Sequence, residues 1–208
     1  MYKNYKRWVN NRQLLKLYTT SSREPFYDII KSYLPLSSEA RIIDIGTGNG
    51  SFPFYLKLNK LYKNLILFDS NPESLKNINN HNTILYTLPN KLPLDDISID
   101  FIHCSHVIEH LHFSDVYSSF IEIDRVLKKD GVVVFSGPIF SNGFYNDLTH
   151  VKPYNPSVFL NYFIQDKENQ TLSVLPDDYL LLKLVTRYEQ IKPNHIIGWK
   201  SDIIIIDF

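Results

Sequence analysis

Residues suited to binding a ligand gather in one short stretch. Three glycines, Gly46, Gly48 and Gly50, stand at alternate positions shortly after Asp44. They follow an apolar run with adjacent β-branched residues, which predicts a buried strand. Glycines between a strand and a helix let the bare backbone approach a ligand, and the first N–H groups of the helix point at negative charge. The alternative is a tight turn in which glycine serves only its dihedral angles.

The residues after the glycines predict a helix start. Ser51 is a suitable cap, and Pro53 falls in the first turn, where its missing N–H is not needed. The spacing excludes two nucleotide-binding loops. Ser51 stands where the dinucleotide fingerprint Gly-x-Gly-x-x-Gly needs its third glycine, and no Gly-Lys-Ser/Thr triplet of a P-loop follows.

A carboxylate stands at a second position suited to a nucleoside. Asp69 closes the next apolar run, 23 residues after Gly46. Doubly wound folds place an acid about 20 residues on, where it binds ribose hydroxyls. A carboxylate suits this task because it can accept a hydrogen bond from both hydroxyls of a diol. The alternative is an Asp that only caps the following helix.

Histidines suited to proton transfer follow two later strands. His106 and His110 come after the expected fourth strand, and Asp147 and His150 lie in the loop after the fifth. Both segments should lie at the carboxyl edge of the sheet, where a histidine can act as general base toward a hydroxyl. We expect His106 or His150 to be that base. Asp147 could fix the tautomer of His150, or it could make only local turn hydrogen bonds.

The segment around His106 also has the spacing of a metal site. His106, Glu109 and His110 fall at i, i+3 and i+4, on one face of a helix, and two imidazoles with a carboxylate can bind a divalent ion. We nevertheless expect no metal, and a supporting role for this segment. Of the other histidines, we expect His103 to be packed within the fourth strand. We expect the remaining three to lie on the surface or in loops: His81, His112 and His195.

Alternating strands and helices must position these residues. Helices are expected over residues 2–20, 24–34, 52–61, 73–79, 114–127 and 156–163, and strands over 42–45, 64–68, 83–86, up to 104, 132–135, 180–191 and 201–208. Gly131 should follow the C-terminus of the helix over 114–127. The pattern predicts an α/β fold with a doubly wound, mostly parallel seven-stranded sheet, helices on both faces and an antiparallel C-terminal edge strand.

Length and composition indicate one domain over residues 1–208. We divide it into N-terminal helices that could form a lid (1–37), a ligand-binding core (38–140), an insertion on the acceptor side (141–170) and closing strands (171–208). The 22 basic residues balance 22 acidic ones, so no global field favours nucleic acid. The single cysteine excludes an intrachain disulfide, and we expect a cytoplasmic protein without a signal peptide or membrane span.

Four motifs in register carry a family resemblance over about residues 38–140. They are residues 42–50, residues 67–73, the block from Leu92 to His110, and residues 125–131. Their order and spacing resemble the class I (Rossmann-like) S-adenosylmethionine-dependent methyltransferases of the type 11 family. The resemblance implies S-adenosylmethionine as cofactor. The cofactor-binding residues are then expected to be Asp44, Gly46, Thr47, Gly48, Asn49, Gly50, Asp69, Ser70, Leu88 and Ser105.

One of these positions departs from the family pattern. Such enzymes often carry an acid shortly before Leu-Pro to contact the adenine amine, and here that position is Leu88. Adenine is therefore expected to be held by backbone and packing. The catalytic residues are expected to be His106, His110, Asp147 and His150, with no metal ligand.

The resemblance implies methyl transfer by direct displacement. We expect O-methylation of a small molecule or glycan precursor, since the run from Asp147 to Tyr154 resembles a segment of methyltransferases associated with surface-polysaccharide pathways. One alternative is a non-catalytic, cofactor-binding or partner-activating subunit. Another is a nucleic-acid methyltransferase, which the balanced charge and the absence of an Asn/Asp-Pro-Pro-Tyr tetrapeptide disfavour. The sequence leaves the oligomeric state and the identity of the acceptor open.

Overall fold

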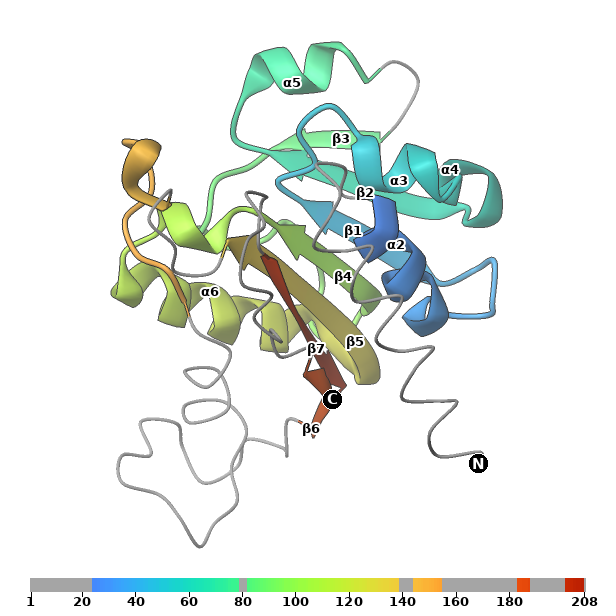
Figure 1. Ribbon diagram of the computed structural model, residues 1–208. Coiled ribbons are helices and arrows are strands. Elements are labelled where there is room, and N and C mark those ends of the chain that lie inside the picture. Colours follow the sequence, from blue (N-terminus) through green and yellow to red (C-terminus); the bar gives the residue numbers. More distant parts are fainter. Residues whose placement is uncertain (1–23, 79–81, 139–143, 155–182, 188–200, 208) are drawn as a thin grey trace, which may run out of the picture.

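The computed structural model describes residues 24–78, 82–138, 144–154, 183–187 and 201–207 (Figure 1). The helices predicted over residues 2–20 and 156–163 lie outside these ranges, as do His81 and His195. Among the residues described, no helix is both long enough and apolar enough to cross a lipid bilayer.

Five parallel strands form the body of the sheet. They are β1 (Arg41–Ile45), β2 (Asn64–Asp69), β3 (Asn82–Leu85), β4 (Ile99–Ser105) and β5 (Leu127–Pro138), in the order β3-β2-β1-β4-β5. The order reverses between β1 and β4, and in such sheets ligands bind beyond the carboxyl ends of the strands at this reversal. The predicted α/β class with a parallel, doubly wound sheet is confirmed.

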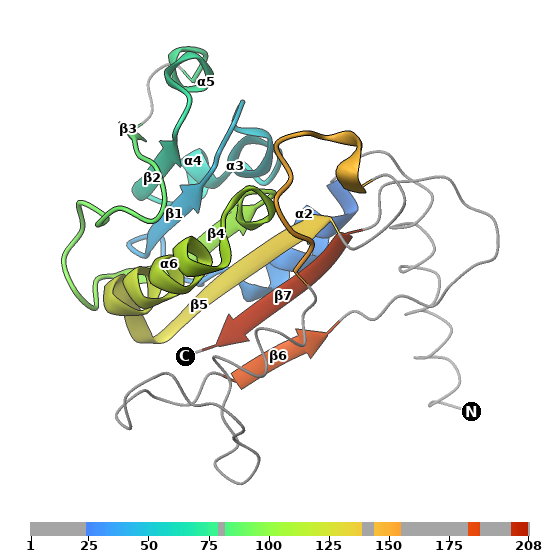
Figure 2. The ribbon, with the colours of Figure 1, turned by 90° about the vertical axis from the view of Figure 1, so that its left-hand side faces the viewer.

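Two further strands follow β5 in the sheet. β7 (Ser201–Asp207) pairs antiparallel with β5, and β6 (Lys183–Arg187) pairs antiparallel with β7 (Figure 2). Both lie on the side of β5 that is away from the reversal between β1 and β4.

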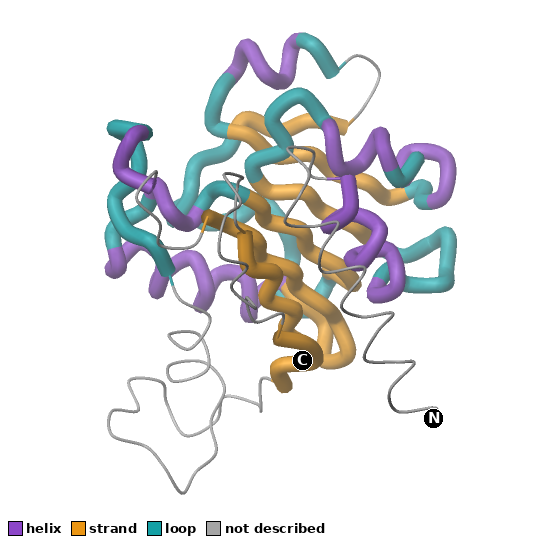
Figure 3. Tube along the Cα trace, in the orientation of Figure 1, coloured by secondary structure: helices purple, strands orange, loops and turns teal. Residues whose placement is uncertain are grey.

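Helices cover both faces of the sheet (Figure 3). The longest, α6 (Phe113–Val126), packs on one face, whereas α2 (Glu24–Ile30), α3 (Ser51–Tyr55) and α4 (Leu58–Leu61) pack on the other (Figure 1). The other helical segments within the described ranges are short: η1 (Lys31–Tyr33), α5 (Pro72–Lys76), η2 (Ile108–His110) and η3 (Phe144–Asn146).

The strands are apolar on both sides because both faces are covered. In β1, Ile43 and Ile45 join the core beneath α6, and Ile42 joins the core beneath α2, α3 and α4. Asp44 points to the same side as Ile42, since side chains alternate along a strand. A buried carboxylate therefore lies in the second core, where it needs a partner.

The expected helix over 52–61 is two helices instead of one. Lys57 adopts a left-handed conformation (φ 56°), which ends α3 and starts α4. The helix also begins one residue earlier than predicted. Gly50, with φ 77°, is the N-cap, and Ser51 is the first helical residue. Ser51 therefore donates its hydroxyl to Asn49 Oδ1 (2.5 Å) and does not cap the helix.

The predicted end of α6 was also wrong. Leu127 is already extended (ψ 138°) and pairs with Ile99, so β5 begins there and not at Val132. The register between β4 and β5 shifts within this stretch: Phe101 already faces Val132, so the residues between Leu127 and Val132 form an irregularity in the strand. Gly131 is part of β5 and does not follow a helical C-cap.

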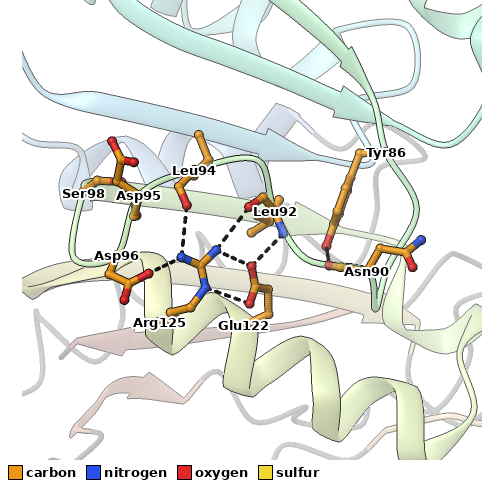
Figure 4. Close-up of polar contacts among 9 residues, drawn as sticks. All are labelled: Tyr86, Asn90, Leu92, Leu94, Asp95, Asp96, Ser98, Glu122 and Arg125. Carbon is orange, nitrogen blue, oxygen red and sulfur yellow. Dashed lines mark hydrogen bonds and ion pairs between the residues drawn. The ribbon is translucent and has the colours of Figure 1, made fainter.

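A polar network fixes the loop between β3 and β4 against α6 (Figure 4). The guanidinium of Arg125 donates to the carbonyl oxygens of Leu92 (3.1 Å) and Leu94 (3.0 Å), and it pairs with the carboxylates of Asp96 and Glu122. Glu122 also accepts the Leu92 N–H (2.6 Å). The network thus satisfies backbone groups that a loop would otherwise leave unpaired, and it holds the loop beside the core.

Candidate active site

The glycine loop is fixed at its base and open at its tip. Gly46 and Thr47 both donate their N–H groups to the carbonyl oxygen of Phe68, at 2.8 and 2.9 Å. Gly46, Gly48 and Gly50 all have positive φ, which favours glycine. A Cβ on Gly46 would lie 2.3 Å from a methyl group of Val107, whereas a Cβ on Gly48 would meet nothing within 4 Å. Gly48 is therefore where a ligand can approach the backbone.

Asp69 connects the glycine loop with the loop after β2. One carboxylate oxygen accepts the N–H of Gly48 (2.7 Å), and the other accepts the N–H of Asn71 (2.8 Å). Asn71, and not Asp69, caps α5 by accepting the N–H of Glu73. Each carboxylate oxygen of Asp69 keeps a second lone pair, so the two oxygens can still accept hydrogen bonds from two hydroxyl groups.

Four other predicted cofactor residues have different surroundings. The Thr47 hydroxyl is buried and has no hydrogen-bond partner, so it is available to a ligand. Ser70 is exposed beside Asp69, and Ser105 shares a hydrogen bond with the hydroxyl of Ser136 (2.5 Å). Leu88 is a buried member of the core beneath α6.

Asp44 is turned away from the glycine loop toward a histidine. Its Oδ1 lies 2.6 Å from Nδ1 of His103, and both side chains are nearly inaccessible to solvent. The ring of Phe52 stacks on His103, with centroids 3.6 Å apart. His103 is packed within its strand, as expected, but its role as the partner of Asp44 was missed. The signal was present, because each is the polar residue of an otherwise apolar stretch and the two are register neighbours.

The segment after β4 does not form the helix face that the spacing suggested. His106 has φ 56° and precedes the single 3₁₀ turn η2, so it is not one helical turn from His110. Its Nδ1 faces Glu109 Oε1 at 3.3 Å. A bulky residue rarely adopts positive φ, and such conformations are concentrated at functional sites.

Residues 144–154, drawn in orange in Figure 2, fold back against the segment that follows β4. The carbonyl oxygen of Glu109 accepts the N–H groups of Val151 (2.8 Å) and Lys152 (3.3 Å). These bonds bring His150 against His110, with ring centroids 5.0 Å apart. Three of the four predicted catalytic residues thus lie close together: His110, Asp147 and His150. The fourth, His106, lies beside Glu109, which in turn lies near His110 and His150.

Asp147 does not hold His150 as hypothesised. Nδ1 of His150 lies 2.8 Å from the carbonyl oxygen of Phe144, whereas Asp147 Oδ2 is 3.8 Å from Nε2. Asp147 Oδ1 accepts the N–H and the hydroxyl of Thr149, at 2.9 and 2.6 Å. These hydrogen bonds from Thr149 hold the pKa of Asp147 below its usual value. Asp147 therefore shapes the turn that carries His150.

Glu109 was not among the predicted site residues, yet its environment is the most unusual in the region. Its side chain is 2% exposed, and neither carboxylate oxygen has a hydrogen-bond partner. It lines a small open pocket together with Ser136, Gly137 and Tyr154. Burying an unpaired carboxylate costs free energy, so we expect the Glu109 carboxylate to bind a partner from outside the protein chain.

A family model described as a methyltransferase domain (Methyltransf_11) matches residues 43–135. This segment is therefore similar to the methyltransferase domain family. The domain runs from β1 to β5 and contains the glycine loop, Asp69, His106 and His110, whereas Asp147 and His150 lie beyond it.

A named protein of Arabidopsis thaliana is also similar to part of this chain. A probable methyltransferase of Arabidopsis thaliana, PMT19, is 32% identical over 124 residues, which are 54% of this chain and 19% of that protein. The chain thus spans about a fifth of the length of this relative.

Solved structures share the fold. A SAM-dependent methyltransferase from Archaeoglobus fulgidus superimposes with a TM-score of 0.61 at 21% identity, over 90% of this chain and 95% of that one. A SAM-dependent methyltransferase from Aquifex aeolicus gives a TM-score of 0.54 at 17% identity, over 86% and 87%. The predicted resemblance to class I methyltransferases is thus found in the segment 43–135 that the family model matches, and the fold of these structures is shared.

The residues of the methyltransferase domain fit S-adenosylmethionine. The open side of Gly48, the unpaired hydroxyl of Thr47 and the two oxygens of Asp69 lie together at the carboxyl ends of β1 and β2. Gly48 leaves space at the backbone, the Thr47 hydroxyl can donate a hydrogen bond, and the Asp69 oxygens can accept from a ribose diol.

Proposed function

We propose that this chain is an S-adenosylmethionine-dependent methyltransferase that methylates a hydroxyl oxygen of a small molecule or glycan precursor by direct displacement. The observation that carries the proposal is the hydrogen bond from Gly48 N–H to Asp69 (2.7 Å). It joins the two loops that a nucleoside must contact, within a domain of the methyltransferase family.

The bound cofactor would supply an electrophilic methyl group on a sulfonium. The residues of the chain have two tasks, which are to align the acceptor oxygen with that methyl group and to keep water out. Gly48 and Asp69 hold the nucleoside, and Thr47 offers its hydroxyl to the cofactor. The core surroundings of Leu88 support an adenine held by packing.

A hydroxyl acceptor requires a base, and His106 has the geometry that supports this role best. Its imidazole is 17% exposed, and Nδ1 faces the buried carboxylate of Glu109. A carboxylate at this distance stabilises the imidazolium that forms when Nε2 takes a proton. His110, Asp147 and His150 complete the acceptor side, with Asp147 and Thr149 shaping the loop.

The remaining parts of the chain have proposed roles in the same reaction. Residues 1–37 are proposed either to pack at one edge of the sheet or to form a lid over the acceptor, and residues 141–170 are proposed to form the acceptor side. The pair β6 and β7 would close a seven-stranded sheet, and such an edge would leave the carboxyl ends of β1, β4 and β5 free for ligands.

Calorimetry and a turnover assay test the proposal. The purified chain should bind S-adenosylmethionine and its demethylated product but not NAD. It should then transfer methyl groups to hydroxylated sugars or small molecules, detected as demethylated cofactor. Cofactor binding without turnover on any acceptor would favour a non-catalytic, partner-activating subunit. Binding of NAD alone would overturn the proposal.

A further inference from the structure

We propose that Glu109, His110 and His150 form a binding site for one divalent transition-metal ion on the acceptor side. One carboxylate oxygen and one nitrogen of each imidazole lie within 4.8 Å of one another. An ion at the centre of such a group can reach all three atoms after small side-chain movements, since metal–ligand distances in these sites are about 2.0–2.2 Å. The sequence spacing had suggested His106 as a ligand, and the structure replaces it with His150.

The buried carboxylate is the first observation that points to an ion. Glu109 is 2% exposed, and both of its oxygens lack a hydrogen-bond partner. Removing an ionised carboxylate from water costs several kcal/mol unless a cation or hydrogen-bond donors compensate. Three backbone N–H groups of the adjoining segments are bonded elsewhere, since Val151 and Lys152 donate to the main-chain carbonyl of Glu109 and His106 donates to that of Ser136.

The two imidazoles are oriented in the manner of metal ligands. Nδ1 of His150 lies 2.8 Å from the carbonyl oxygen of Phe144. Nδ1 of His110 lies 3.0 Å from the hydroxyl oxygen of Thr149 and 3.2 Å from its carbonyl oxygen. The carbonyl oxygens only accept, and the Thr149 hydroxyl already donates its proton to Asp147 Oδ1, so each Nδ1 carries the proton and each Nε2 keeps its lone pair. Ligating histidines commonly donate their second ring N–H to a backbone carbonyl in this way.

Backbone contacts hold the two ligand segments in place. Glu109 O accepts from Val151 and Lys152, and the hydroxyl of Tyr154 donates to Leu111 O (3.1 Å). These bonds connect residues about 40 positions apart in the sequence on both sides of the ligand group. The geometry of the three ligands therefore does not depend on an ion to bring the segments together.

Two neighbouring groups could instead interact with the ligands, and neither satisfies them. His106 Nδ1 is 3.3 Å from Glu109 Oε1 but makes no hydrogen bond with it. Asp147 Oδ2 is 3.8 Å from His150 Nε2, which is too long for a hydrogen bond, and its other oxygen is held by Thr149. A protonated His106 that neutralises Glu109 is the arrangement the experiment must exclude.

The ligand set indicates the class of ion. Imidazole nitrogens with one carboxylate suit Zn²⁺, Mn²⁺, Co²⁺ or Fe²⁺ better than Ca²⁺ or Mg²⁺. Three protein ligands leave open positions for water or for a substrate oxygen. If the proposed methyl transfer holds, on which this use of the ion rests, an acceptor hydroxyl bound there would ionise more readily and need less from a base.

Metal binding to the full chain tests the site directly. The chain is stripped with a chelator and titrated with Zn²⁺ and Mn²⁺ by calorimetry, and elemental analysis gives the number of ions per chain. We expect one ion per chain. Glu109→Gln, His110→Ala and His150→Ala should each weaken binding by roughly 10–100-fold or more, the range seen for supporting residues of such sites.

A matched control separates the site from general histidine binding. His112→Ala removes an exposed imidazole two residues from His110 that lies outside the ligand group, and it should leave affinity and stoichiometry unchanged. His110 is itself exposed, so His110→Ala should fold even if Glu109→Gln does not. Unaltered affinity in His110→Ala and His150→Ala, or no bound ion in the unaltered chain, would overturn the proposal.

Cofactor affinity is measured on the same samples. An unaltered chain that binds S-adenosylmethionine but no ion would refute only the metal site. A chain that binds an ion but no S-adenosylmethionine would refute the proposed function and leave the metal site standing. Absorption bands of Co²⁺ bound to the unaltered chain, lost in His150→Ala, would show that imidazole enters the coordination sphere.

Discussion

Nδ1 of His103 on β4 lies 2.6 Å from Oδ1 of Asp44 on β1, across two adjacent parallel strands in the core. Asp44 is the first residue of the glycine motif, yet its carboxylate faces a neighbouring strand. Its contribution is therefore to the packing of β1 against β4, the two strands between which the sheet order reverses.

Replacing His103 should destabilise the fold strongly. His103→Leu leaves Asp44 buried without a partner, and breaking a buried pair in this way costs roughly 3–5 kcal/mol. Urea unfolding measures the change in the free energy of unfolding. The double variant Asp44→Leu/His103→Leu should lose less than the sum of the two single variants. Strict additivity would contradict a direct interaction.

Two glycines of the same loop should respond differently to one added methyl group. Gly46→Ala places Cβ 2.3 Å from Val107 and should lower stability, while Gly48→Ala meets no protein atom and costs only the roughly 1–2 kcal/mol of a left-handed residue. Gly48→Ala should nevertheless weaken S-adenosylmethionine binding, because Cβ occupies the open side of the loop. Calorimetry on the folded variants decides. Full affinity in Gly48→Ala would mean that the ligand does not approach there.

Removing the proposed base should affect turnover and not cofactor affinity. We expect His106→Ala to lower kcat by roughly 10²–10⁴-fold, the usual contribution of a positioned base. The dissociation constant for S-adenosylmethionine should remain nearly unchanged, and the rate of the variant should rise again with pH as hydroxide replaces the base. Normal turnover in His106→Ala together with a loss in His150→Ala would assign proton removal to the loop after β5.

Stability should decline in acid through Glu122. Burial raises the pKa of the Glu122 carboxyl, but hydrogen bonds from Arg125 and the Leu92 N–H outweigh this, so the pKa lies below its ordinary value of 4.5. A carboxyl with a lowered pKa in the folded state contributes stability above its unfolded pKa and loses it as the pH falls through the folded value. The stability difference between the unaltered chain and Glu122→Gln should therefore be largest near neutral pH.

Acid titration of unfolding checks this prediction. The difference between the two proteins should shrink as the pH falls below about 4.5. Asp95→Asn, on the same loop but outside the Arg125 ion pairs, is the control and should follow the unaltered chain. A difference that stays constant with pH would mean that Glu122 acts through packing and not through its charge.

Local patterns placed Gly48 and Asp69 correctly relative to each other. The glycine spacing and the position of Asp69 depend on one strand, one turn and the next strand, and these are adjacent in the sequence. The hydrogen bond between Gly48 and Asp69 is the direct result. The end of α6 was less predictable, because Lys128 to Gly131 have the composition of a helix end whereas pairing with Ile99 extends the strand to Leu127.

The arrangement of the residues proposed for the acceptor side depends on long-range contacts that local sequence patterns do not predict. His106, Glu109 and His110 have helical spacing, but the backbone bond from His106 to Ser136 and its positive φ replace the helix with a 3₁₀ turn. The approach of His150 to His110 depends on how residues 144–154 fold back, which no periodicity records. The partner of Asp44 could have been inferred from strand order, since it requires β1 and β4 to be neighbours.

The N–H groups of Val151 and Lys152 donate to one carbonyl oxygen, that of Glu109, whose side chain lines the small pocket beside Ser136 and Tyr154. Their exchange with deuterium therefore reports the opening of the junction between the two segments, with no label attached. Whatever binds in the pocket and stabilises this junction will slow exchange at two backbone positions that it need not touch.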